Sequence, residues 1–259
     1  MTKLAANLTM LFNELPFMER FGAAAAAGFE GVEFLFPYAF EANAIAAQLK
    51  QHGLALVLHN LPAGKWDAGE RGIACHPDRV DEFRQGVDQG ILYAKALGVS
   101  QLNCLVGIVP PNVSQQEAHR TVVANLSFAA AKLKEAGIRL LIEPINTFDI
   151  PGFFLCRTSQ AEALIQETGS DNLFIQYDIY HMQRMEGEIA TTLKDKLHLI
   201  KHVQLADNPG RNEPGTGEIN YAYLFRQLDA LGYDGWIGCE YKPKGTTAEG
   251  LGWRAAHGV

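Results

Sequence analysis

Four short apolar runs in the second half of the chain are each followed by a side chain that carries a metal-competent oxygen. A run of this kind is typical of a strand in an all-parallel sheet, where both faces are buried. Four oxygen side chains at intervals of roughly 30 residues predict a common rim of a βα-repeat barrel, the rim where such barrels do their chemistry. The runs and the side chains that follow them are 140–142 with Glu143, 173–177 with Asp178, 202–203 with Gln204 and 236–239 with Glu240.

The same alternation of strand and helix patterns occurs eight times along the chain. Helical periodicity is clearest at 78–97 and 114–136. These patterns predict an α/β fold, a (β/α)8 TIM barrel formed as one domain by residues 1–259. A doubly wound open sheet is the alternative, but its glycine-rich phosphate turn is missing after the first predicted strand. The strands are predicted near 3–10, 31–36, 54–60, 100–106, 139–145, 173–179, 200–206 and 236–241.

Glycines and loop lengths predict which end of the barrel carries the site. A glycine just after a helix can take the left-handed conformation that ends it, so a recurring glycine there marks short αβ turns. The loops at the opposite rim are longer and more polar, most clearly at 62–77 and 207–220, and this asymmetry indicates the functional end. The helix-ending glycines are Gly28, Gly53, Gly98, Gly137 and Gly232.

Composition favours a small-molecule partner. The net charge of −7 is spread along 259 residues without a Lys/Arg-rich stretch, which argues against nucleic acid and anionic membranes as partners. The first residues lack the pattern of a secretory signal, and no apolar run reaches membrane-spanning length, so a cytoplasmic protein is expected. Four scattered cysteines show neither zinc-type spacing nor a disulfide pattern.

The four rim side chains form an all-oxygen donor set. Three carboxylates and an amide suit a hard divalent ion such as Mg²⁺ or Mn²⁺ and argue against zinc or copper. Pro144 biases Glu143 towards an extended conformation and withholds a ladder donor, so the strand should end there. The alternative is a set of rim salt bridges, for which the strands offer few cations, chiefly Arg139 and Lys201.

Five residues are candidates for binding an anionic substrate. Two are histidines near strand ends, which can hydrogen-bond a hydroxyl or a carboxylate, and the others are cations in the two long loops, which can close over a negative charge. For each of them an ordinary structural or solvated role is the alternative. His202 should instead be a buried, hydrogen-bonded residue one layer below Gln204. The candidates are His59, Lys65, Arg71, His181 and Arg211.

Several strings resemble the hydroxypyruvate isomerase family of the xylose-isomerase-like TIM barrels, over the whole chain. The most specific are AGERGIA (68–74), IEPIN (142–146), YDIYH (177–181), HVQLADNPGR (202–211), EPGTGEIN (213–220) and CEY (239–241). The resemblance implies that Glu143, Asp178, Gln204 and Glu240 hold the metal, with Glu143 and Glu240 as the acid/base pair. In related ketose epimerases and xylose isomerases the position of Gln204 is commonly His, whereas Gln agrees with the hydroxypyruvate isomerase subgroup.

The resemblance further implies an isomerase, an intramolecular oxidoreductase of the aldose–ketose type. It would shift a carbonyl between C2 and C3 of a short hydroxy-keto acid through a metal-stabilised enediolate, as in hydroxypyruvate to tartronate semialdehyde or 2-oxotetronate to 3-oxotetronate. A ketose 3-epimerase on the same scaffold is the nearest alternative. An endonuclease-IV-like metal hydrolase wants a histidine-rich zinc cluster and a basic face, which this sequence lacks. A non-catalytic ligand-binding barrel is a third alternative. The sequence leaves the substrate, the metal, the choice between proton and hydride transfer, and the oligomeric state open.

Overall fold

The eight predicted strands close into a parallel barrel. The computed structural model describes residues 2–259, and each strand pairs in parallel with the next along the chain, while β8 closes the ring on β1. The fold class predicted from the sequence is therefore confirmed, and the open sheet is excluded. The strands are β1 (Lys3–Asn7), β2 (Gly31–Phe34), β3 (Ala55–Asn60), β4 (Gln101–Cys104), β5 (Arg139–Ile142), β6 (Leu173–Asp178), β7 (Ile200–Leu205) and β8 (Trp236–Cys239).

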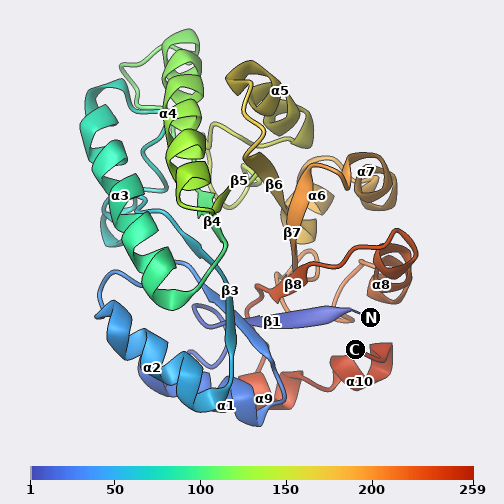
Figure 1. Ribbon diagram of the computed structural model, residues 1–259. Coiled ribbons are helices and arrows are strands. Elements are labelled where there is room, and N and C mark those ends of the chain that lie inside the picture. The colour runs from blue at the N-terminus through green and yellow to red at the C-terminus, as the bar shows by residue number, and fades with distance from the viewer. Residues whose placement is uncertain (1) are drawn as a thin grey trace.

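Helices form a ring around the barrel, and both termini lie near β1 and α10 (Figure 1). The main apolar core lies between this ring and the strands, where the amphipathic helices bury their apolar faces. The α-helices are α1 (Arg20–Ala26), α2 (Ala42–His52), α3 (Val80–Leu97), α4 (Gln115–Glu135), α5 (Thr158–Thr168), α6 (Ile179–Met185), α7 (Ile189–Lys196), α8 (Tyr221–Ala230), α9 (Thr247–Gly250) and α10 (Trp253–His257); 3₁₀ turns occur at η1 (Phe17–Glu19), η2 (Trp66–Ala68) and η3 (Pro77–Arg79). Within residues 2–259, none of the helices combines the length and the hydrophobicity needed to cross a bilayer.

Most strands end up to three residues earlier than the sequence patterns predict. β5 ends at Ile142 rather than 145, and β4 at Cys104 rather than 106. The backbone beyond these points leaves the ladder for the loops of the rim: the N–H of Ile145 donates to the carbonyl of Leu155, 2.9 Å away, instead of to a neighbouring strand. Apolar sequence therefore continues past the strand because the rim loops are themselves buried.

The five helix-ending glycines behave as predicted. All have positive φ, from 66° at Gly53 to 80° at Gly28. Helix 78–97 of the prediction is observed as η3 followed by α3, and 114–136 as α4. The αβ turns are consequently short, and the long loops stand at the carboxyl ends of the strands, as the sequence indicated.

The upper interior of the barrel is polar rather than filled with branched apolar side chains. Glu33 of β2 bonds to His202 and Gln204 of β7, so these three side chains must cross the interior. His202 is fully buried, which confirms the prediction of a buried, hydrogen-bonded residue beneath Gln204. This polar layer lies directly beneath the site and is called its floor below.

All four cysteines are free thiols.

Candidate active site

Three carboxylates and one histidine meet at the carboxyl rim of the barrel. Glu143 directly follows β5, Asp178 ends β6, His181 lies in the first turn of α6 and Glu240 directly follows β8. Each offers one ligand atom, and these atoms all lie within 4.8 Å of one another. None of the four residues is more than 4% exposed. Residues that are up to 97 positions apart in the chain (143 to 240) thus form one buried cluster, which has the composition of a metal site.

Crowding of the carboxylates changes their protonation. Burial, together with the charges of Glu240 and Asp178, raises the pKa of Glu143 well above its usual range. Burial also raises the pKa of Glu240 to about 8 and that of Asp178 to about 6, although the cation of Arg211 opposes both shifts. Without a bound cation, the cluster therefore holds protons near neutral pH, whereas a cation would favour the ionised forms.

Hydrogen bonds orient His181 towards the carboxylates. Its Nδ1 lies 2.6 Å from Nδ2 of Asn146, an amide nitrogen that donates. Nδ1 is then the acceptor and the proton of the neutral ring is on Nε2, which lies 3.5 Å from Oδ2 of Asp178 and 3.9 Å from Oε1 of Glu143. Burial lowers the pKa of His181 well below its ordinary value, and Arg211 and Arg184 lower it further, so the ring is neutral.

Arg211 brings the only guanidinium that contacts the cluster in residues 2–259. Its Nη2 lies 2.6 Å from Oε2 of Glu240 and 3.6 Å from Oδ2 of Asp178. The guanidinium also stacks over the ring of Tyr180, 5.1 Å from its centroid. The loop therefore supplies the counter-charge, while Arg139 and Lys201, the two strand cations noted in the sequence, lie at the other end of the barrel.

The carboxylate of Asp207 shapes the loop that delivers Arg211. It accepts hydrogen bonds from the backbone N–H groups of Asn208, Gly215, Gly217 and Ile219, at 2.9 to 3.0 Å. Four charge-assisted bonds to one carboxylate fix an otherwise irregular segment. Arg211 itself has φ 55°, in the left-handed region, a local strain that the anchored loop supports.

Gln204, the fourth predicted ligand, stands beside Asp178 in the register of β6 and β7. Its Oε1 accepts from Nε2 of Gln176 at 2.6 Å, and its Nε2 donates to Oε1 of Glu33 at 2.7 Å. The amide is thus held at both ends by buried side chains. Its role as a metal ligand stays a prediction.

Glu33 is the centre of the floor beneath the cluster. Its carboxylate also accepts from Nδ2 of Asn7 at 2.9 Å and from Nε2 of His202 at 2.6 Å. A Cβ at Gly238 would lie 2.3 Å from Oε2 of Glu33, so only glycine leaves room for this carboxylate. Asn7 continues the network upwards, because it also donates to Glu240 at 3.3 Å.

The other predicted substrate residues lie away from these contacts. His59 pairs in register with Phe34 and stacks on it, 6.3 Å between ring centroids. Successive side chains of a strand point to opposite faces, so Phe34 faces the helix layer because its neighbour Glu33 faces the interior, and His59 lies on the same side as Phe34. Burial in this layer lowers the pKa of His59 to about 4. This position gives no support to a substrate role for His59.

Lys65 and Arg71 belong to the loop after β3. Arg71 lies over the ring of Trp66, 4.2 Å from the centroid, and donates to the carbonyls of Trp66 and Glu70. Lys65 lines a separate cavity with Phe36 and Trp66. Among the described residues, neither side chain contacts the carboxylate cluster, so their substrate roles stay predictions.

Sequence reasoning missed the polar support of the site. Asn103 of β4 donates to Oε2 of Glu143 at 3.1 Å, and Gln176 holds Gln204. One signal was available: a polar residue two positions before a predicted ligand shares its face of the strand, as Gln176 does with Asp178. For Glu33 and Asp207 no such signal exists, because the partners of Glu33 come from distant strands and those of Asp207 from an irregular loop without a periodic pattern.

Comparisons with known proteins agree with this architecture. The family model of the xylose isomerase-like TIM barrel matches residues 21–257. The chain is 55% identical to the hydroxypyruvate isomerase of Escherichia coli (strain K12) over 253 residues, 98% of each chain. It is 46% identical to the 2-oxo-tetronate isomerase of Cupriavidus necator, covering 98% of this chain and 97% of that one.

A solved structure from Brucella melitensis, described as an AP endonuclease of family 2, superposes with a TM-score of 0.96 at 46% identity and covers 99% of both chains. Matches of this extent to curated isomerases confirm the expectation of an isomerase enzyme. The chain therefore belongs to the hydroxypyruvate isomerase family, which includes 2-oxotetronate isomerases, within the xylose isomerase-like TIM barrels.

Proposed function

We propose that this protein isomerises a short hydroxy-keto acid by moving its carbonyl between C2 and C3 in a metal-dependent reaction. The observation that carries the proposal is the convergence of three buried carboxylates from β5, β6 and β8 beside a single arginine. Moving a carbonyl to the neighbouring carbon takes a proton from the hydroxyl-bearing carbon, returns one to the former carbonyl carbon, and transfers the hydroxyl proton to the former carbonyl oxygen. Two carboxyl groups of different proton affinity, placed on opposite sides of a substrate, provide that exchange.

The donor set fits a hard divalent cation. Oδ2 of Asp178 is fully buried and has no hydrogen-bond partner, a costly arrangement that a cation would relieve. Glu143, Asp178 and Glu240, with the amide oxygen of Gln204, would hold Mg²⁺ or Mn²⁺. Bound there, the ion supplies positive charge that offsets the negative charge of an enediolate.

Glu143 and Glu240 are the proposed acid/base pair. Their surroundings differ: Glu143 accepts a neutral amide donor, Asn103, whereas Glu240 accepts the guanidinium of Arg211. The charged partner favours the ionised form of Glu240 relative to Glu143. In this assignment Glu240 removes the proton from the substrate carbon and Glu143, in its protonated form, returns one.

Arg211 and His181 are the proposed contacts to the substrate. Arg211 reaches the cluster from a loop, and while its Nη2 stays on Glu240 its other N–H groups can donate to the carboxylate of a keto acid. His181 presents Nε2–H towards the cluster, where it can donate to a substrate oxygen. Together they would orient a small anion, with its carboxylate on Arg211 and an oxygen of its reacting carbons on His181.

The test is turnover of purified protein, supplied with Mg²⁺ or Mn²⁺, on hydroxypyruvate, 2-oxotetronate and free ketoses. We expect turnover of one or both acids and none of the ketoses; epimerised ketose would instead establish the epimerase alternative. Running the reaction in D₂O separates two routes. Deuterium at the product carbon supports proton transfer by a carboxylate, whereas its complete absence supports a hydride shift.

The description of the Brucella structure motivates a second test, for cleavage of DNA at abasic sites. The cluster offers three carboxylates and one histidine, while zinc sites favour nitrogen and sulfur ligands. A net charge of −7 also opposes binding to a phosphate backbone. We expect no cleavage of an abasic duplex with Zn²⁺ or Mn²⁺, under conditions in which the keto acids turn over.

A further inference from the structure

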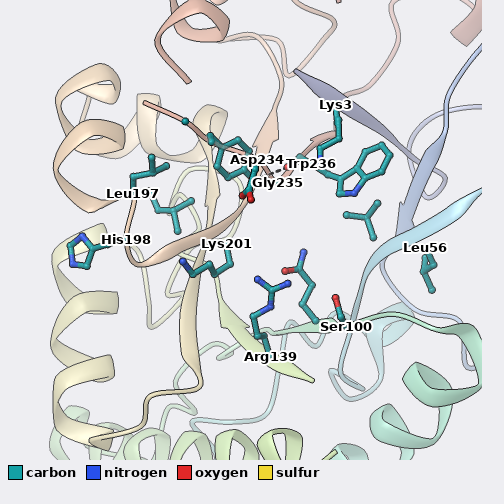
Figure 2. Close-up of a pocket in the computed structure, with 15 residues that line it drawn as sticks. Lys3, Leu56, Ser100, Arg139, Leu197, His198, Lys201, Asp234, Gly235 and Trp236 are labelled. Carbon is teal, nitrogen blue, oxygen red and sulfur yellow. Dashed lines mark hydrogen bonds between the residues drawn. The ribbon is translucent and has the colours of Figure 1, made fainter. Parts of the chain in front are cut away.

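A cavity opens at the end of the barrel opposite the carboxylate cluster. It has a volume of about 540 Å³ and is lined by the first residues of several strands, including Lys3 of β1, Gln101 of β4, Arg139 of β5 and Lys201 of β7. This volume lies within the range of sites for small molecules, about 300 to 1,000 Å³. Figure 2 shows Arg139 and Lys201 on one side of the space, with Lys3 and Trp236 across from them.

The lining of this cavity is positively charged in a protein that is acidic as a whole. Lys3, Arg139 and Lys201 carry fixed charges, and Asp234 is the one carboxylate among the lining residues. The titratable groups that complete the lining are His198, which is exposed, and Tyr233, whose hydroxyl donates to the carbonyl of Trp236. A local excess of cations in a chain of net charge −7 attracts anions.

Two polar side chains of the cavity have no hydrogen-bond partner among residues 2–259. The guanidinium of Arg139 makes neither a hydrogen bond nor an ion pair there. Gln101 is 5% exposed, and its side-chain amide likewise lacks a hydrogen bond among the described residues. Lys3 and Lys201 face only aromatic rings, 5.4 Å from Trp236 and 5.3 Å from Phe174.

Two other partly buried cations of the described residues are paired with carboxylates. Arg79 bonds to Glu70 and Glu82, and Lys196 bonds to Glu162. Arg139 and its neighbours differ from them in having donors aimed at an open space. A guanidinium presents a planar fork that matches a carboxylate or a phosphate, and Gln101 adds an amide donor.

We propose that this cavity binds a small organic anion bearing a carboxylate or phosphate group, held by Arg139 and Lys201 with Gln101 as a neutral donor. The binding site is separate from the active site, and the proposal does not depend on the proposed function. It names a second binding function for the end of the barrel that would otherwise serve stability alone.

The experiment is isothermal titration calorimetry of the metal-loaded protein with 3-phosphoglycerate, inorganic phosphate and glycerate as probes. We expect a saturable site that persists in Arg211→Gln and weakens with added salt, and the ranking of the three probes separates phosphate from carboxylate recognition. Arg139→Gln should weaken binding by about tenfold or more, because a charge-assisted fork is lost. Arg139→Lys, which keeps the charge without the fork, should lie between that variant and the wild type.

The matched control is Arg120→Gln, which removes the same charge from the exposed start of α4, at the other rim. It should bind the probes as the wild type does. Arg211→Gln reports on the carboxylate cluster: binding lost there but kept in Arg139→Gln would place the probe at the active site and overturn the proposal. Absence of saturable heat in the wild type would overturn it as well, and the cations would then serve to offset the carboxyl ends of the helices.

Discussion

The two ends of the barrel carry opposite kinds of ionisable side chain on the same eight strands. At the carboxyl rim three buried carboxyl groups lie beside one arginine, whereas the cavity at the amino rim is lined by three cations and one carboxylate. The difference in burial is equally large: the acidic cluster is at most 4% exposed, while Lys3 and Asp234 are exposed. Long loops cover the first end and short turns leave the second open. Loop length, not the strand ring, therefore decides which charges can be brought together away from water.

A single strand shows the contrast at its sharpest. β5 begins with Arg139 at the open end and is followed, four residues after that arginine, by Glu143 at the closed end. Both side chains lie on the inward face, because their separation is even. Arg139 lacks a hydrogen-bond partner among the described residues, whereas Glu143 is packed against other carboxyl groups. Substitutions at the two positions can therefore test the two ends independently.

Removal of the metal should have the largest effect, and only at the carboxyl rim. Protein stripped with a chelator should lose turnover of keto acids, because uncompensated carboxylates would remain in the site. It should also unfold at lower temperature, since a ligand at 100 times its Kd stabilises by about 2.7 kcal/mol. Activity assays and thermal unfolding, with Mg²⁺ or Mn²⁺ added back, check both effects. Full activity after stripping would remove the metal from the proposal.

Neutralising either proposed acid/base residue should come next in size. Glu143→Gln and Glu240→Gln should lower kcat by roughly 10²- to 10⁴-fold, because the proton exchange loses one partner. Circular dichroism should show an unchanged fold, and Arg120→Gln, at an exposed position of the same rim, serves as the control with wild-type rates. Wild-type turnover in either glutamine variant would refute its assignment.

The free energy of unfolding should depend on pH through the buried carboxyl groups of the carboxyl rim. The folded-state pKa of Glu240 is raised to about 8 and that of Asp178 to about 6, so between the unfolded values near 4 and these values the folded protein holds more protons than the unfolded one. The stabilisation that these carboxyl groups give to the metal-free protein should therefore be complete below about pH 4 and be lost progressively as pH rises towards 8.

Urea unfolding at pH 5, 6.5 and 8 measures this dependence. Metal-loaded protein should show a weaker dependence or the reverse, because the metal binds the ionised carboxylates. A metal-free protein that is equally stable from pH 5 to pH 8 would contradict the protonated cluster.

Adding one methyl group beneath the site should have a moderate effect. Gly238→Ala places a Cβ 2.3 Å from the carboxylate of Glu33 and should lower the free energy of unfolding by about 1–3 kcal/mol. The matched control is Gly252→Ala, whose added Cβ meets no atom within 4 Å at a φ of −57°. Denaturant unfolding compares the two. Equal stability of both variants would contradict this prediction and show that the carboxylate of Glu33 can move aside at little cost.

The smallest expected effect concerns the amino rim. Asp234→Asn removes the one carboxylate of the cavity and should strengthen binding of 3-phosphoglycerate by about two- to threefold, since the residue is exposed and its charge is screened. Calorimetry at low and high salt measures the change. Weaker binding in this variant would mean that Asp234 contacts the anion through a shared proton or a cation.

The sequence predicted the barrel and the converging carboxylates because both follow from local patterns. Apolar runs with a period near 30 residues give the strands, and glycines such as Gly53 give the short turns. The sequence pattern extended the fifth strand to residue 145, whereas β5 ends at Ile142, because the buried loop that follows has the same apolar composition as a strand. It also could not predict that Arg211 reaches Glu240, because the path of the loop depends on Asp207 accepting hydrogen bonds from four N–H groups of the same loop. Irregular contacts of this kind leave no periodic trace in a single sequence.

Glu33 also limits which amino acids can occupy position 204. A side chain there has to present a hydrogen to the buried carboxylate on its lower side and a lone pair on its upper side. Glutamine meets both demands with its two amide atoms, and a neutral histidine meets them with its two ring nitrogens, whereas aspartate or glutamate would set two negative charges against each other. The choice of amino acid at position 204 is thus restricted by Glu33, a residue of another strand that need not touch metal or substrate.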